Sequence, residues 1–166
     1  MEHTTVLSSI AEGVAAALIA RNDTIAVSES STGGIISAAL LAIPGASAYY
    51  RGGGVIYTGA ARAALLGIPA WLPGAIRSAS EPYAALCAAS IRDRLGAVWG
   101  LAETGAAGPT GNSYGDKAGH CCIAIMGPTQ KVVTLATKSN QREENMWAFA
   151  EAALEHLAGC IKDASE

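Results

Sequence analysis

Charged and aromatic residues are scarce in this sequence. Asp, Glu, Lys and Arg make up 15% of the 166 residues, against roughly 25% in an average globular domain, and there is a single phenylalanine. Much of the surface must therefore be neutral or covered by another subunit, and we expect a homo-oligomer. The net charge of −3 provides no excess of Lys and Arg for a nucleic-acid footprint, so nucleic acid is not an expected partner.

Motifs for disulfides, metals and export are missing as well. No C-x-x-C pair occurs and no histidine lies at zinc-ligand spacing from a cysteine, so we expect no disulfide framework and no metal. The N-terminal stretch MEHTTVLSSIAEG is acidic where a signal peptide would be basic. The uncharged stretch 32–50 is interrupted by Gly33-Gly34 and by Pro44-Gly45, which argues against a membrane span. These absences predict a soluble cytoplasmic protein with no membrane partner.

Alternating helix and strand patterns predict the fold. Apolar periodicity and helix-end signals predict helices over 6–21, 33–43, 59–68 and 80–95, and a last helix that opens with a capping box of Asn140 and Glu143. Short apolar runs predict strands over 23–28, 52–58, 97–103, 120–126 and 131–137, the last two joined as a hairpin. We therefore expect a single domain over residues 1–166, folded as a three-layer α/β/α sandwich with a mixed, mostly parallel sheet.

Three of the predicted strands end in polar or glycine-rich segments. These are SESSTGG (28–34), YTGAAR (57–62) and ETGAAGPTGN (103–112). Ligands of open α/β sheets bind at the carboxyl ends of strands, so we expect Ser30, Arg62 and the 105–111 loop to line one cleft. A helix beginning near Thr32 would also point its positive end at a phosphate or an oxyanion. The alternative is that these segments are tight turns without a ligand.

Four linked segments together resemble a known family. ESSTGG (29–34), RGGGVIYTGAAR (51–62), SASEP (78–82) and TGAAGPTG (104–111) occur in the order and spacing of the CinA C-terminal domain family, and the resemblance extends over nearly the whole chain. That family includes nicotinamide mononucleotide deamidases and competence/damage-inducible proteins. The resemblance implies an amide hydrolase of NAD salvage that converts nicotinamide mononucleotide to nicotinic acid mononucleotide and ammonia. It also implies a serine nucleophile and no metal or other cofactor.

The resemblance further implies which residues form the site. The family motif, which resembles E-S-C-T-G-G, places the nucleophile at Ser30, with Ser31 where cysteine is usual. The N–H groups around Thr32 and Gly33 would then stabilise the oxyanion of a tetrahedral intermediate, at roughly 3 kcal/mol per donor. Tyr57 would line the site, or pack as an ordinary strand tyrosine. The expected ligand contacts are Ser31, Thr32, Gly33, Gly34, Arg51, Gly105, Ala106, Gly108, Pro109, Asn112 and Lys117; Arg51 could equally hold its own loop.

One segment departs from the family pattern, which resembles Y-S-N-x-x-K. Arg62 replaces the lysine that is thought to activate the serine, and Gly59 replaces the asparagine. A guanidinium stays protonated and cannot act as a general base, although it can hold a phosphate or a carboxylate. Lys117 and His120 are the other candidate bases, and each has a plainer alternative as a loop charge or a strand residue.

Three functions therefore stay open. The first is a working amidase in which another group serves as the base. The second is a catalytically weak or silent family member that binds a pyridine nucleotide. The third is an oligomeric partner protein with a vestigial cleft.

Overall fold

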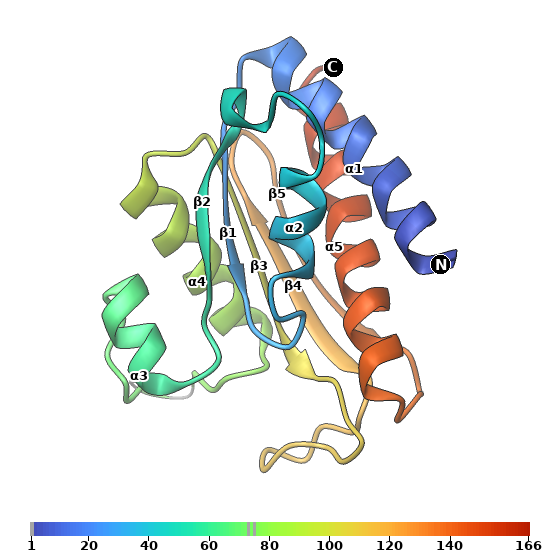
Figure 1. Ribbon diagram of the computed structural model, residues 1–166. Helices are drawn as coiled ribbons and strands as arrows, with labels where there is room; N and C mark the ends of the chain where they lie inside the picture. The colour runs from blue at the N-terminus through green and yellow to red at the C-terminus, as the bar shows by residue number, and fades with distance from the viewer. Residues whose placement is uncertain (1, 73, 75) are drawn as a thin grey trace.

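The strands of this protein form one mixed sheet with helices on both faces (Figure 1). The computed structural model describes residues 2–72, 74 and 76–166. The elements in chain order are α1 (Glu2–Arg21), β1 (Ile25–Glu29), α2 (Ile35–Leu41), η1 (Ala46–Ala48), β2 (Tyr50–Val55), α3 (Gly59–Ala61), η2 (Arg62–Leu66), α4 (Glu81–Leu95), β3 (Trp99–Ala106), β4 (His120–Met126), β5 (Gln130–Ala136) and α5 (Arg142–Asp163). Every strand expected from the sequence is present, with its bounds shifted by at most three residues.

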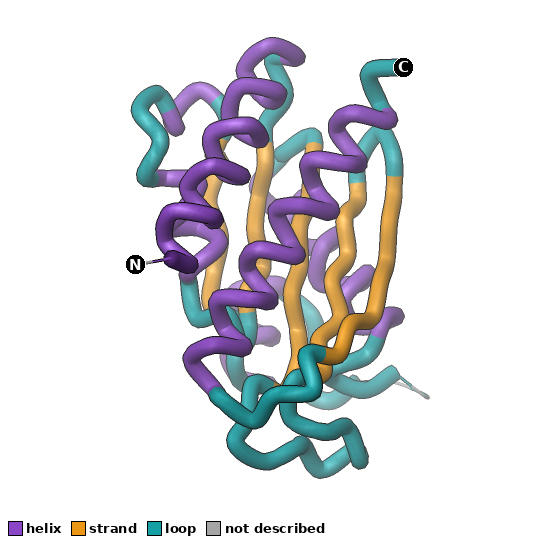
Figure 2. The backbone as a smooth tube through the Cα atoms, turned by 90° about the vertical axis from the view of Figure 1, so that its right-hand side faces the viewer, coloured by secondary structure: helices purple, strands orange, loops and turns teal. Residues whose placement is uncertain are grey.

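The sheet joins a parallel half to an antiparallel half. Its strand order is β2-β1-β3-β4-β5; β1 pairs in parallel with β2 and β3, while β4 pairs antiparallel with β3 and β5. Figure 2 shows the strands side by side behind α1 and α5. The predicted α/β/α sandwich with a mixed sheet is confirmed. Because β1, β2 and β3 run in the same direction, the three segments that follow them begin at one edge of the sheet.

Side-chain alternation in β1 and β3 assigns residues to two cores. Val27 and Leu101 belong to the core under α1, α2 and α5, whereas Ala26 and Ala102 belong to the core under α4. Gly100 allows the close approach of α4, because a Cβ at this position would collide with the Ala88 carbonyl oxygen. The sheet is therefore covered on both faces, and its carboxyl edge is where side chains can meet a ligand.

The first helix, α1, is long and apolar enough in composition to pass as a candidate membrane span. In the fold, however, Leu7, Val14 and Leu18 of this helix are buried in the core shared with α2, α5 and the sheet. The apolar residues of α1 therefore have a place in the core of the domain.

The start of α2 differs from the sequence prediction. Gly33 and Gly34 have left-handed backbone angles, with φ of 64° and 104°, and the helix begins only at Ile35. The predicted helix start near Thr32 is therefore wrong, and residues 30–34 form a turn.

The start of α5 also differs. Its N-cap residue is Gln141, whose side chain makes no capping hydrogen bond. The Asn140 side chain instead accepts a hydrogen bond from the Gln141 carboxamide at 3.2 Å. The predicted capping box of Asn140 and Glu143 is therefore wrong.

Candidate active site

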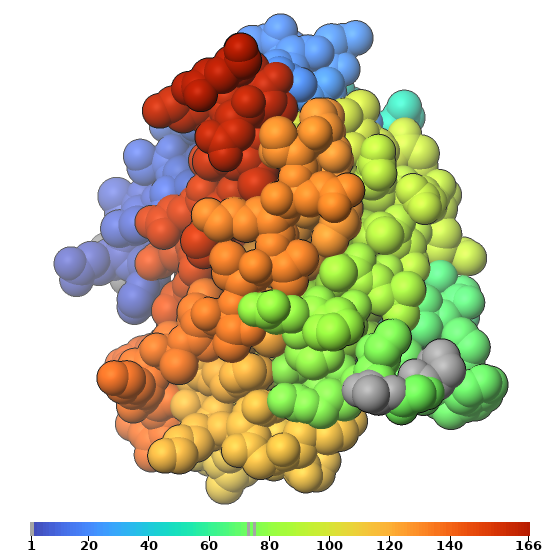
Figure 3. Space-filling view, turned by 180° about the vertical axis from the view of Figure 1, so that it is seen from behind, coloured from blue at the N-terminus to red at the C-terminus, as the bar shows by residue number. Residues whose placement is uncertain are grey.

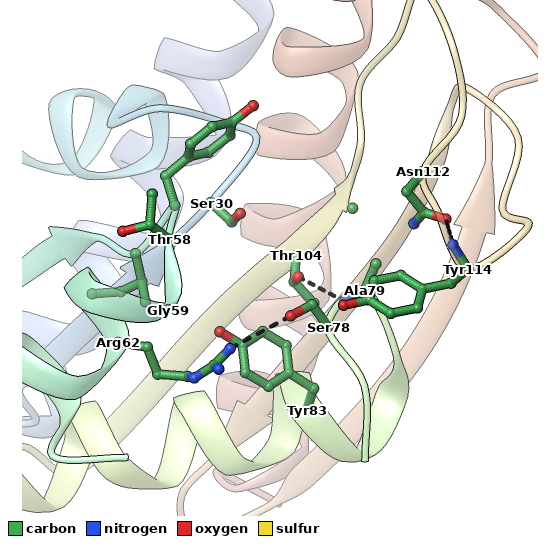
Figure 4. Close-up of a pocket in the computed structure, with 13 residues that line it drawn as sticks. Ser30, Thr58, Gly59, Arg62, Ser78, Ala79, Tyr83, Thr104, Asn112 and Tyr114 are labelled. Atoms are coloured by element: carbon green, nitrogen blue, oxygen red, sulfur yellow. Dashed lines mark hydrogen bonds between the residues drawn. The ribbon is translucent and has the colours of Figure 1, made fainter. Parts of the chain in front are cut away.

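A cavity of about 280 Å³ lies at the carboxyl ends of β1, β2 and β3. It is bounded by the turn after β1, the segment after β2, the start of α4 and the loop after β3. Figure 4 shows its labelled side chains converging from these separate segments. The lining residues are Ser30, Ile56, Tyr57, Thr58, Gly59, Arg62, Ser78, Ala79, Tyr83, Thr104, Gly105, Asn112 and Tyr114.

The turn that carries Ser30 is held by two buried carboxylates, of which Glu29 is the first. Its side chain accepts hydrogen bonds from the N–H groups of Gly34 at 3.1 Å and of Ile36 and Ser37, both at 2.9 Å. It also accepts the Thr32 hydroxyl at 2.8 Å. The positive end of α2 is thus satisfied by the chain itself, and the prediction that it would receive a ligand anion is wrong.

Glu103 in β3 is the second buried carboxylate. Its Oε2 accepts the N–H groups of Ser30 and Thr32, both at 3.0 Å, while its Oε1 accepts the Ser31 hydroxyl. The Thr32 hydroxyl oxygen lies 2.8 Å from this Oε2 as well, so its single proton is shared between Glu29 and Glu103. The Gly33 N–H donates to the Ser30 carbonyl at 3.2 Å. The predicted oxyanion donors around Thr32 and Gly33 are therefore occupied, and Ser31 and Thr32 are buried without lining the cavity. This part of the site prediction is wrong.

The Ser30 side chain points away from these carboxylates. Alternation along the chain places Glu29 and Glu103 on the α2 side of the sheet edge and places Ser30 and Thr104 on the α4 side, where the cavity lies. In Figure 4, Ser30 lies between Thr58 and Thr104. Its hydroxyl forms no hydrogen bond within residues 2–72, 74 and 76–166. Ser30 therefore presents a free hydroxyl to the cavity from a turn that is fixed from behind.

Arg62 faces Ser30 across the cavity but is itself anchored. Its guanidinium donates from Nε to the Pro69 carbonyl at 3.1 Å, from Nη2 to the Ala70 carbonyl and, at a long 3.5 Å, from Nη1 to the Ser78 hydroxyl. It also lies over the Tyr83 ring, 5.4 Å from the centroid. A guanidinium has five N–H donors in a planar fork, so two remain for a ligand. Arg62 thus joins the segment after η2 to the wall of the cavity.

The described residues that line the cavity offer Ser30 no proton acceptor. Among the described lining residues, the charged side chain is Arg62, and there is no carboxylate, imidazole or amine. Burial raises the pKa of Tyr83 to about 12, so its phenol stays neutral. His120 donates from Nε2 to the Ala79 carbonyl at 2.8 Å, and Lys117 lies in a separate hollow. The two alternative bases considered from the sequence therefore do not line this cavity.

The end of β3 and the loop after it contribute part of what was predicted. Gly105 and Asn112 line the cavity, whereas Ala106, Gly108 and Pro109 do not. The Asn112 side chain is committed to its own loop, since its Oδ1 accepts the Asp116 N–H at 3.1 Å and its Nδ2 donates to the Asp116 carboxylate at 2.8 Å. Asn112 therefore shapes the wall rather than presenting a free amide.

Arg51 lies away from the site. It is the second residue of β2, next to Tyr50, which pairs with Ile25 at the start of β1. At about 3.3 Å per residue, roughly 13 Å of strand separates it from Val55 at the other end. Within one chain, Arg51 therefore lies near the opposite end of β2 from the Ser30 cavity, and its expected role as a ligand contact stays a prediction.

Sequence reasoning missed Arg142, the first residue of α5. Its guanidinium donates to the Gly108 carbonyl at 2.6 Å and to the Tyr57 hydroxyl at 3.2 Å, and Tyr57 lines the cavity with 61% of its surface exposed. Arg142 forms no ion pair among the described residues. Arg142 lies thirty residues after the end of the glycine-rich segment 103–112, and no motif in the sequence indicated its contact with Tyr57.

Known proteins share this fold and sequence pattern. A curated CinA-like protein of Synechococcus sp. (strain CC9902) is 42% identical over 104 residues, which are 63% of this chain and 25% of that protein. A CinA-like protein of Anaeromyxobacter sp. (strain Fw109-5) is 39% identical over 147 residues, 87% of this chain and 36% of that protein. The chain thus spans between a quarter and about a third of the length of these relatives.

Solved structures agree with these sequences. The competence damage-inducible protein A of Klebsiella pneumoniae has a TM-score of 0.88 and 27% identity, covering 94% of this chain and 97% of its own. A competence/damage inducible protein of Agrobacterium tumefaciens has a TM-score of 0.83 and 27% identity, covering 93% and 95%. The family model of the CinA C-terminal domain matches residues 7–161. The chain therefore belongs to the CinA C-terminal domain family.

Proposed function

We propose that this chain binds nicotinamide mononucleotide at the Ser30 cavity and hydrolyses its amide slowly or not at all. The observation that carries the proposal is the combination of a free Ser30 hydroxyl, an opposing Arg62 guanidinium and no proton acceptor among the described lining residues. Family membership supports a hydrolase site at this position. The lack of a base among the described lining residues supports weak catalysis, and the Arg62 guanidinium in the cavity wall supports retained binding.

The cavity suits a nucleotide that is only partly enclosed. Its volume of about 280 Å³ is at the lower limit of small-molecule sites, which span roughly 300–1,000 Å³. Tyr57, Tyr83 and Tyr114 provide aromatic surface for a pyridine ring and its ribose. The phosphate would then lie at the open rim, where Arg142 reaches the Tyr57 hydroxyl and carries an unpaired positive charge.

The amide hydrolysis proposed for this site has a nucleophile and an oxyanion donor among the described lining residues, but no general base. Attack by the Ser30 oxygen on the carboxamide carbon forms a tetrahedral intermediate. Its collapse, with the serine proton passed through water to the amide nitrogen, breaks the C–N bond, releases ammonia and leaves an acyl-serine that water hydrolyses. The two uncommitted N–H groups of Arg62 are suited to stabilise the developing oxyanion. None of the described lining residues takes the Ser30 proton, and the loss of general-base assistance lowers rates by roughly 10²- to 10⁴-fold.

We further propose that the chain acts in the cytoplasm, in NAD salvage, and as a homo-oligomer. The support for self-association is the low charge content and a set of large apolar side chains that remain exposed, including Leu65 at 50% and Trp71 at 71%. Light scattering at micromolar concentration measures this directly. A monomeric mass at micromolar concentration would contradict the proposed homo-oligomer.

Calorimetric titration and an ammonia assay test the proposal together. Wild-type protein should bind nicotinamide mononucleotide saturably and release ammonia slowly or undetectably, while Ser30→Ala should keep the binding. Brisk turnover that Ser30→Ala abolishes would contradict the missing base, and Lys117 and His120 would be the next residues to vary. Absence of binding would contradict the proposed ligand.

A further inference from the structure

A second hollow, larger than the Ser30 cavity, lies on the other side of the loop after β3. Its volume is about 910 Å³, and its lining includes Asp116, Lys117, His120, Lys138 and Asn140. Seen from behind in Figure 3, the gold loop of residues 107–119 lies between the green 76–81 segment and the orange 136–142 segment. We call this hollow the Lys117–Lys138 groove.

The groove carries uncompensated positive charge. Neither the Lys117 nor the Lys138 ammonium group forms an ion pair or a hydrogen bond within the part of the chain that the structure describes. The carboxylate of Asp116 is already committed, because Arg77 donates to its two oxygens at 2.7 and 3.0 Å. The Arg77 guanidinium accordingly holds the pKa of Asp116 below its usual range. Two lysine charges therefore face one hollow in a chain whose net charge is −3.

The polar groups around the groove are fixed by the fold. His120 donates from Nε2 to the Ala79 carbonyl at 2.8 Å, which orients the ring and leaves Nδ1 for another partner. Lys138 has a left-handed backbone with φ of 61°, a conformation that costs a lysine roughly 1–2 kcal/mol. The adjoining Ser139 N–H donates to the Thr137 hydroxyl at 3.2 Å, which helps to hold this turn. Glycine or asparagine would adopt this left-handed conformation with a lower conformational free energy than Lys138 does. Backbone strain of this kind concentrates at functional sites.

We propose that the Lys117–Lys138 groove binds a phosphate-bearing small molecule, separately from the Ser30 cavity. Two ammonium groups and an imidazole edge are suited to a phosphate, to which lysine binds as a point charge. The volume falls within the range of small-molecule sites and accommodates a sugar phosphate or a mononucleotide. Two lysines are too few for a nucleic-acid footprint, so the ligand is a small molecule.

The groove shares its wall with the Ser30 cavity. Asp116 lines the groove and accepts a hydrogen bond from Asn112, which lines the cavity. Arg77, which pairs with Asp116, also lies over the ring of Tyr114, 5.1 Å from its centroid, and Tyr114 lines the cavity as well. A ligand in the groove therefore contacts the same loop that closes the cavity.

Titration with pyrophosphate tests the groove without involving nicotinamide. Calorimetry would give the affinity, and amide chemical shifts of the ¹⁵N-labelled full chain would give the location. Lys117→Gln/Lys138→Gln should weaken binding by about tenfold or more. The matched control Lys131→Gln/Lys162→Gln removes the same charge from the far end of the sheet and should leave the affinity within about twofold.

Three outcomes would overturn the proposal. They are an absence of saturable binding, an equal loss in the control variant, and shifts confined to the Ser30 cavity. Failure of nicotinamide mononucleotide to bind would contradict the proposed function but not the groove, because pyrophosphate lacks the pyridine ring and the ribose. Ribose 5-phosphate, titrated in parallel, shows whether the groove accepts a sugar phosphate or only inorganic anions.

Discussion

Replacing Arg62 by lysine separates the two roles of this side chain, which are to anchor the Pro69–Ala70 segment and to place a positive charge near Ser30. The guanidinium holds the Pro69 carbonyl at 3.1 Å and the Ala70 carbonyl, and it covers the Tyr83 ring at 5.4 Å. A lysine ammonium is a point charge on a flexible stem, so it can keep one of the carbonyl contacts but not the planar pair. Arg62→Lys should therefore introduce an amine near Ser30 and at the same time loosen the Pro69–Ala70 segment.

The expected loss of stability follows from these contacts. A hydrogen bond to a charged group contributes about 1.5–3 kcal/mol, and a largely desolvated cation–π contact about 1–2 kcal/mol. Pro69 and Ala70 are exposed, so water recovers part of the loss at their carbonyls. We expect a net destabilisation of about 2 kcal/mol, equivalent to a fall of about 4–8 °C in melting temperature for a domain of this size.

Thermal and urea unfolding followed by circular dichroism measures this effect. The matched control is Arg92→Lys, because Arg92 donates through Nε to one backbone carbonyl, that of Val98, at 2.9 Å. The control should lose less than half as much stability as Arg62→Lys. If Arg62→Lys melts within about 1 °C of the wild type, a change worth under about 0.5 kcal/mol, the anchoring argument is wrong.

The same variant tests the missing base. Arg62→Lys should release more ammonia from nicotinamide mononucleotide than the wild type, since a desolvated lysine can lose its proton near neutral pH. Adding Gly59→Asn should raise the rate further, although a Cβ at position 59 would lie 3.1 Å from the Ala70 carbonyl oxygen and requires that segment to shift slightly. Unchanged activity in a folded double variant would refute the role assigned to position 62.

Three further predictions follow from buried groups. Glu103→Gln should destabilise the protein by about 2–4 kcal/mol, because one carboxamide oxygen cannot replace two carboxylate oxygens for the donors of the Ser30 turn. The control Glu12→Gln, on the exposed side of α1, should change urea stability by under about 0.5 kcal/mol. The raised pKa of Tyr83, about 12 in the fold against about 10 when unfolded, gives a stabilisation that is complete below pH 10 and is lost as the pH rises toward 12. Urea midpoints of Tyr83→Phe should therefore fall less steeply over that range than those of the wild type, and parallel curves would exclude this contribution. Burial raises the pKa of the Cys87 thiol to about 11, so mass spectrometry should find it unmodified by iodoacetamide in the native protein and alkylated in urea, and rapid native alkylation would contradict its burial.

Local patterns in the sequence predicted the strands and the approximate place of the site. Alternation and apolar runs depend on neighbouring residues alone, which is why β4 was predicted with its observed bounds. The convergence of Ser30, Tyr57, Arg62 and Gly105 followed from the rule that parallel strands end at the same edge.

Long-range pairing limited the rest of the prediction. The glycine and hydroxyl groups of residues 30–34 suggested free donors for a ligand, but their partner Glu103 is more than 70 positions away in the chain. Arg62 was interpreted through its charge, whereas its contacts with Pro69 and Ala70 depend on a π-helical turn that the helix periodicity did not indicate. Sequence spacing cannot supply such contacts, because they depend on the relative placement of whole elements.

The two walls of the Ser30 cavity differ in how freely they can evolve. The Ser30 turn is tied to Glu29 and Glu103, so a substitution at either glutamate leaves buried donors of the turn without partners. The opposite wall is held by Arg62 on the backbone carbonyls of two exposed residues, Pro69 and Ala70, to which water can donate when the side chain changes. A change between lysine and arginine at position 62 therefore alters the cavity wall at a moderate cost in stability and leaves the hydrogen bonds of the Ser30 turn intact.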